Sequence, residues 1–102
     1  MRIIELDAAD WCDLMDFYGA LMGALGSPTW HGRNVNAWVD SMLYGGINEI
    51  EPPYLIRLSG TSKCSPELQR CIEQLSNVIR EAREWKKQHY GVDTVVGFEI
   101  NP

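Results

Sequence analysis

The sequence predicts an α/β fold, in which a parallel β-sheet is covered by helices and the elements follow the order β-α-α-β-α-β. Short apolar segments alternate with longer stretches whose apolar residues recur every three or four positions. The short segments are apolar runs rather than clean alternations, a pattern that favours parallel strands covered by helices. The length of 102 residues, 45% of them hydrophobic, predicts one domain spanning residues 1–102.

The first expected strand is residues 2–6, RIIEL, which contains a β-branched pair. A helix is expected at 11–25, because Asp10 can cap its start and Gly26 and Pro28 end it. One helical stripe supports this range, and its members are Trp11, Leu14, Met15, Tyr18, Leu21, Met22 and Leu25.

A second helix is expected from Asn34, which can cap it, to the stop at Gly45 and Gly46. Its buried face would comprise Val35, Trp38, Val39, Met42 and Leu43. The opposite, polar face would comprise Asn36, Ala37, Asp40, Ser41 and Tyr44.

The second half of the chain is expected to form a loop at 45–53, followed by a strand, a helix and a strand. Residues 54–58 form the expected second strand. Ser65 and Pro66 are typical of a helix start, and Gly91 closes that helix. Residues 94–100 form the expected third strand. The stripe of the long helix is Leu68, Cys71, Ile72, Leu75, Val78, Ile79, Ala82 and Trp85.

Charge and cysteine content argue against several classes of protein and several kinds of binding site. The net charge is −5, and the acids concentrate in residues 1–59, which argues against nucleic acid as a direct ligand and permits a basic partner. No apolar run is long enough to span a membrane and no secretory signal pattern opens the chain, so we expect a cytoplasmic protein. The three cysteines lack zinc-site spacing, so we expect reduced thiols, no metal and no cofactor.

The segment WHGRNVNAWVD, residues 30–40, concentrates aromatic and polar residues and admits three interpretations. A hydrolase could use His31 with Cys12 or Ser41, but no nucleophile elbow or paired-acid motif accompanies them. Single-stranded nucleic acid could stack on Trp30 and Trp38, but Trp38 falls on the expected buried stripe.

The third interpretation is a protein-docking surface on the second helix. Asn36 and Asp40 are four residues apart and share one helix side, which Tyr44 extends by another turn. Trp30, Gly32 and Asn34 lead into that side. An exposed aromatic, a tight turn and an outward acid suit a docking surface, although a plain solvated face would show the same spacing.

The same segment resembles the barstar family, intracellular inhibitors of barnase-type ribonucleases. Eight residues fit the family register without a gap: Pro28, Trp30-His31, Gly32, Asn34, Asn36, Trp38 and Asp40. The resemblance continues upstream through Asp16-Phe17-Tyr18 and downstream at Arg80-Glu81-Ala82 and Gly91-Val92-Asp93.

The resemblance implies a three-stranded parallel sheet and a second helix that plugs a toxin's active site, its acids replacing substrate phosphates. Asp40 falls on the family's principal acid, Glu81 on a secondary acid and Trp30 on a contacting tyrosine. Asn36 falls on a second acid, so that charge is missing here. His31 replaces an aromatic residue and Arg33 adds a positive charge.

We therefore expect a non-enzymatic immunity protein that binds a ribonuclease toxin in a 1:1 complex and is a monomer when free. The expected contact residues are Trp30, His31, Gly32, Asn34, Asn36, Asp40, Tyr44 and Glu81. The alternatives are immunity against a toxin of another chemistry, such as a DNase, and a small hydrolase centred on His31.

Overall fold

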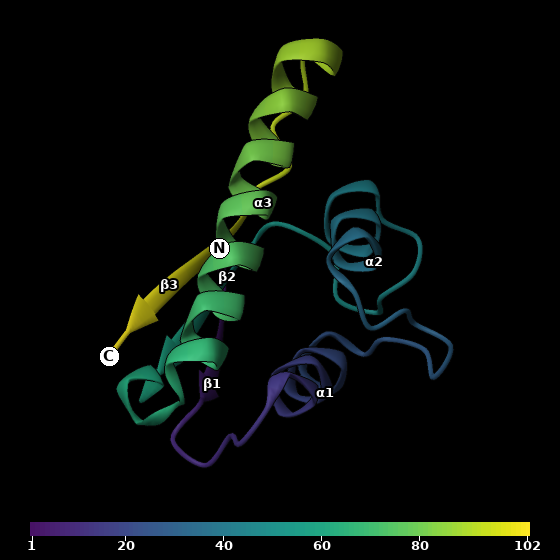
Figure 1. Cartoon of the computed structure of the whole chain (residues 1–102). Helices are drawn as coiled ribbons and strands as arrows, with labels where there is room; N and C mark the ends of the chain where they lie inside the picture. Colours follow the sequence, from purple (N-terminus) through teal and green to yellow (C-terminus); the bar gives the residue numbers. More distant parts are fainter.

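The computed structural model describes all residues, 1–102, and confirms the α/β class and the predicted order β-α-α-β-α-β (Figure 1). A π-helical turn, η1, continues α2, and a 3-10 turn, η2, precedes α3. The elements are β1 (Arg2–Asp7), α1 (Leu14–Leu25), α2 (Val35–Val39), η1 (Asp40–Tyr44), β2 (Tyr54–Ser59), η2 (Thr61–Lys63), α3 (Pro66–Tyr90) and β3 (Val96–Asn101).

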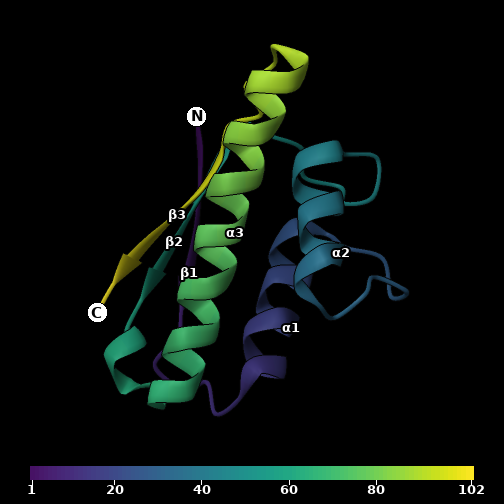
Figure 2. The same cartoon turned by 45° about the horizontal axis from the view of Figure 1, so that its top comes forward.

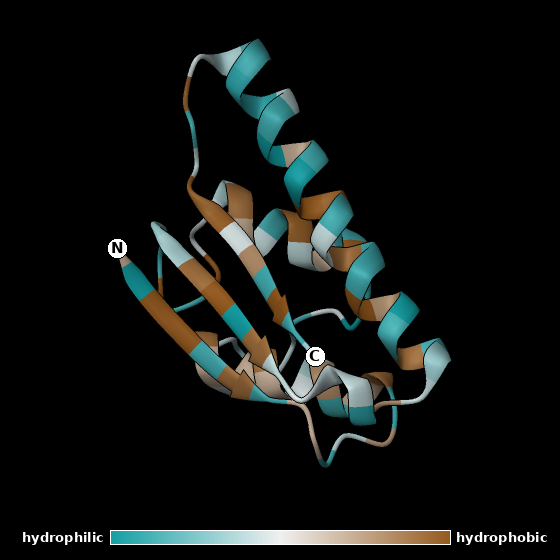
Figure 3. Cartoon of the chain, turned by 90° about the vertical axis from the view of Figure 1, so that its left-hand side faces the viewer, coloured by the Kyte–Doolittle hydropathy of each residue, from teal (hydrophilic) through white to brown (hydrophobic).

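The three strands form one parallel sheet in the order β1-β2-β3, with Ile4 paired to Ile56 and Ile56 paired to Phe98. Both crossovers step in the same direction across the sheet, and right-handed crossovers then place their helices on the same face. Figures 2 and 3 show α1, α2 and α3 together on that one face. The helical cover is therefore one-sided, and the central strand buries only alternate residues, Tyr54, Ile56 and Leu58.

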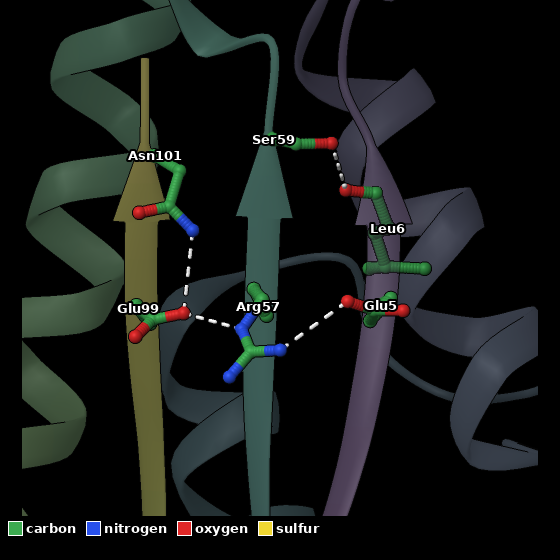
Figure 4. A network of polar contacts seen from close by, with 6 residues as sticks. All are labelled: Glu5, Leu6, Arg57, Ser59, Glu99 and Asn101. Atoms are coloured by element: carbon green, nitrogen blue, oxygen red, sulfur yellow. Dashed lines mark hydrogen bonds and ion pairs between the residues drawn. The ribbon is translucent and has the colours of Figure 1, made fainter.

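The open face of the sheet carries a row of charges, seen in Figure 4. Register places Glu5, Arg57 and Glu99 side by side on the three strands. The Arg57 guanidinium donates to Glu99 and lies 3.3 Å from a Glu5 carboxylate oxygen. The hydrogen bond from Arg57, with a further one from Asn101, holds the pKa of Glu99 below its ordinary value. Cross-strand charge pairs thus occupy the face of the sheet that no helix covers.

The first helix begins later than predicted. Asp13, not Asp10, is the N-cap, and its side chain accepts from the Asp16 backbone N–H at 3.1 Å while the Asp16 carboxylate accepts from the Asp13 N–H at 3.2 Å. This reciprocal pair satisfies two free backbone donors, which gives Asp13 the advantage over Asp10. Trp11 consequently precedes the helix, where its ring lies 5.4 Å from that of Phe17.

The long helix α3 has the predicted start and stop. The Ser65 hydroxyl accepts from the Leu68 N–H at 3.1 Å, and Gly91 ends the helix with φ 70°. Two details differ from the prediction. Trp85 is 48% exposed instead of buried, and β3 begins at Val96 rather than at residue 94.

The core lies between the sheet and the helices and contains 17 buried apolar residues; β1 adds only the partly buried Ile4 and Leu6. The cysteines are free, as predicted, although Cys64 is buried and burial raises its pKa. None of the helices combines the length and apolar character needed to cross a membrane.

Stability at acid pH should depend on the charge row. The pKa of Glu99 is lowered from 4.5 in the folded chain, so its contribution is present above that value and is lost as pH falls through the lower, folded pKa. We expect the thermal midpoint to fall as the pH is lowered below 4.5, and Arg57→Gln to flatten that fall, in melting curves recorded from neutral to acid pH.

Arg70→Gln is the matched control, because Arg70 is exposed and makes no ion pair. It should keep the parent slope. Parallel pH curves for the parent and Arg57→Gln would show that the row contributes nothing.

Candidate functional site

The exposed side of α2 and η1 presents the polar residues that the sequence predicted there. Asn36, Asp40 and Tyr44 are all exposed. In Figures 1 and 2, α2 lies at the outer side of the helical layer, away from the sheet. The Asp40 carboxylate makes no hydrogen bond and no ion pair within the chain, although its backbone N–H is bonded to the carbonyl groups of the preceding turn. This acid is consequently free to bind an external cation.

The second half of the predicted helix is a π-helical turn, and this turn changes one assignment. Ser41 was expected on the polar face, but it is buried. A π-turn closes on the fifth residue instead of the fourth, so the 3.6-residue pattern no longer tells which side a residue occupies. Asp40 and Tyr44, the first and last residues of the turn, stay outside.

Trp38 anchors this surface from below. Its side chain is fully buried, as predicted, and its ring lies 4.1 Å from the His31 ring and 6.1 Å from the Tyr18 ring. One side chain therefore joins α1, α2 and the loop between them.

His31 is an internal residue, only 5% exposed, although the sequence placed it among the contact residues. Its Nδ1 lies 2.6 Å from the Gly32 carbonyl oxygen and its Nε2 lies 2.8 Å from the Ser41 hydroxyl. A carbonyl only accepts, so Nδ1 carries the proton, and in the neutral ring Nε2 accepts from Ser41. This pair joins the loop residue beside Trp30 to the helix residue beside Asp40.

The loop itself is held close to the start of α2. A side chain on Gly32 would place its Cβ 2.9 Å from the Ala37 Cβ, so this position has no room for one. The Asn34 side chain accepts from the Ala37 N–H at 2.8 Å and caps the helix, as predicted. Trp30 is 72% exposed and extends the outer surface.

A second loop, 45–53, is tied to the end of α1 beside this site. The Ser27 hydroxyl donates to the Asn48 side chain at 2.6 Å. The backbone N–H groups of Glu49 and Ile50 bond to carbonyl groups at the end of α1, at 3.2 and 3.1 Å. Both loops that flank α2 are thus fixed to the same helix end.

The helix α3 contacts this surface through Lys86, and the predicted contact residue Glu81 lies on the same helix. Glu81 is exposed and has no ion-pair partner. Lys86, which the sequence did not single out, donates to the Leu43 carbonyl and to the Thr94 hydroxyl, and its ammonium lies 4.9 Å from the centre of the Tyr44 ring. An open groove of about 430 Å³ runs beside this contact.

The chemistry available here is binding through charge and aromatic surface. His31 and Ser41 are both buried and bonded to each other, so neither reaches a substrate. The chain contains no group of three or more His, Cys, Asp or Glu side chains arranged to hold a metal ion. Unpaired carboxylates beside exposed rings suit a basic protein partner.

A comparison with protein families identifies one match. The family model described as Barstar (barnase inhibitor) matches residues 1–99. No curated protein matches the chain. The match covers every helix, the first two strands, the first four residues of β3 and every predicted contact residue.

The Ser41–His31 pair should matter for stability. Ser41→Ala leaves the buried Nε2 of His31 without its donor, and an unpaired buried polar group costs about 1–3 kcal/mol. We expect a loss of that size in urea unfolding. Ser76→Ala in α3, which removes a hydroxyl with no hydrogen-bond partner, is the control and should change little. Equal effects of the two substitutions would contradict the role of the pair.

Proposed function

Because this chain belongs to the barstar family, we propose that it is an immunity protein that binds and occludes the active site of a ribonuclease toxin. The observation that carries this proposal is the unpaired, exposed carboxylate of Asp40 at the junction of α2 and η1. In this proposal Asp40 takes the place of a substrate phosphate.

The physical basis is electrostatic mimicry. A ribonuclease active site gathers cationic side chains to hold phosphate, and a carboxylate can pair with them through charge-assisted hydrogen bonds. Asp40 lies on backbone that is anchored by buried Trp38, so the acid is presented without a large ordering cost. A carboxylate offers no phosphodiester bond to cleave, so the enzyme stays blocked.

The surrounding residues supply shape and additional charge. Trp30 and Tyr44 are exposed aromatics on either side of the acid in sequence, and Glu81 adds a carboxylate from α3. Gly32 and Asn34 hold the loop close to the helix, and His31 supports it from inside. We propose these residues as the partner-binding set, with His31 acting indirectly.

The positions that depart from the family pattern indicate which toxin this chain would recognise. Asn36 is neutral where the resemblance places an acid, and exposed Arg33 adds a positive charge nearby. These two changes favour a target that differs from barnase at the matching subsite, and a DNase toxin is the alternative that binding assays distinguish. A hydrolase at His31 is disfavoured, because the imidazole and Ser41 are buried.

We propose a 1:1 complex, a monomeric free protein and no direct contact with nucleic acid. The net charge of −5 repels phosphate backbones and accelerates encounter with a basic nuclease.

Asp40→Ala should reduce affinity for the toxin strongly. Removing one member of a desolvated charge pair leaves the partner's cation unpaired and costs about 2–5 kcal/mol, a range for which the barnase–barstar complex of this family is itself a measured case. We expect a loss of at least about 30-fold by calorimetry, with an unchanged melting curve because the side chain is exposed.

Glu73→Ala, an exposed acid on α3, removes the same charge elsewhere and should keep affinity within about threefold at physiological salt. If Asp40→Ala binds like the parent, the phosphate-mimic role belongs to another residue or to none.

Asn36→Asp tests the missing charge. If the toxin holds a second cation opposite this position, the added carboxylate should raise affinity by about tenfold or more and increase its salt dependence. A fall in affinity would instead show that Asn36 makes neutral hydrogen bonds to the partner. Titrations at low and physiological salt separate the two results.

A further inference from the structure

We propose that the projecting end of α3 is a second contact surface for the same basic partner, with the indole of Trp85 stacking against an arginine or lysine side chain at the rim of the partner's active site. This inference rests on the proposed function, because it requires a basic protein bound to the exposed side of α2.

The end of α3 lies beyond the rest of the fold. Its 25 residues span about 37 Å, whereas each six-residue strand spans about 20 Å. Figures 1 and 2 show the last turns projecting past the sheet and past α2, and Figure 3 shows that these turns are mainly hydrophilic. The projecting turns therefore do not serve the core.

Large side chains nevertheless gather on this end. Trp85 is 48% exposed, Tyr90 is 62% exposed and Val92 is 55% exposed. A single exposed aromatic residue needs no explanation, but three large apolar side chains within eight residues, on a segment outside the core, indicate a contact surface.

The Trp85 ring is held in one orientation. The His89 ring stacks on it with centroids 4.1 Å apart and planes 17° apart, and the Tyr90 ring meets it edge-on at 5.7 Å. His89 Nδ1 lies 2.8 Å from the Trp85 carbonyl oxygen, so Nδ1 is the donor and the imidazole is fixed in turn. A side chain that is already ordered loses little entropy when it binds, and this is typical of an interface hot spot.

This patch lies near the end of the candidate docking surface, because the neighbouring residue Lys86 contacts Tyr44. Glu81, Trp85 and His89 follow one another at four-residue intervals, so they form one column along α3. The next residue after Trp85 is Lys86, which touches Tyr44 at the end of η1. Consecutive helix residues point in different directions, so the column lies around the side of α3 from the Lys86–Tyr44 contact, within reach of a partner that extends from Tyr44 along α3.

The charge of Glu81 determines which kind of partner side chain we expect the column to bind. Glu81 forms no ion pair within the chain, although Arg80, Arg83 and Lys87 line the same hollow. Arg83 is instead paired with Asp93 at 2.7 Å, and Lys86 is bonded to groups of η1 and of the segment before β3. A free carboxylate one turn from a fixed indole attracts a guanidinium or ammonium group, which gains both an ion pair and a cation–π contact.

The experiment measures calorimetric affinity for a catalytically inactive barnase-type ribonuclease, chosen as the tightest binder of the parent chain from a panel of such domains. Trp85→Ala should weaken binding by at least about tenfold, and Trp85→Phe should retain most of the affinity because it keeps an aromatic face. Melting curves of both variants should match the parent, because this turn lies outside the core.

Met15→Ala is the control, since it shortens an exposed apolar side chain on α1, outside both the docking surface and the end of α3, and it should change affinity by less than about twofold. If Trp85→Ala binds like the parent while Asp40→Ala does not, this inference is wrong and the proposed function stands. If the parent binds no ribonuclease of the panel, the proposed function is wrong and this inference falls with it. Sedimentation that shows a dimer of the free parent, abolished by Trp85→Ala, would assign the patch to a second copy and overturn the proposal.

Discussion

The complete burial of Trp38 is the constraint on which the proposed docking surface depends. The helix α2 has only five residues before the π-turn, and so short a helix is not stable by propensity alone. Its orientation is set by the indole, which packs between the rings of Tyr18 and His31. With that side chain inside, Asn36 and Asp40 lie outside. The indole Nε1 has no hydrogen-bond partner, so apolar and aromatic packing holds the ring in place.

An inhibitor benefits when its contact residues are fixed before the partner arrives, because ordering them on binding would reduce the affinity. Three internal contacts fix the proposed contact residues of this chain. The His31–Ser41 hydrogen bond joins loop to helix, Gly32 lets the loop backbone approach Ala37, and Asn48 connects the second loop to the end of α1. Each of these contacts is internal, so the outer side chains remain free for the partner.

The sheet and the long helix show two ways in which a small α/β domain treats surface that it cannot bury. Parallel sheets are usually covered on both faces, and this one has helices on a single face. Its open face carries the Glu5–Arg57–Glu99 row, which keeps that face polar. The helix α3 outruns the sheet, so its last turns carry side chains that no core element covers. The first solution places charged side chains on the open face, and the second leaves large side chains exposed at the end of α3.

The sequence by itself determined the element order, the parallel sheet, the helix caps at Asn34 and Ser65 and the outward position of Asp40. Those features follow from local signals, since capping side chains and apolar spacing act within a few residues. The tertiary structure alone decided the burial of His31 and Ser41, the exposure of Trp85 and the π-turn. The burial of a side chain depends on what packs against it from distant parts of the chain. The stripe that ends at Trp85 has the right period, but it continues past the point where the sheet ends.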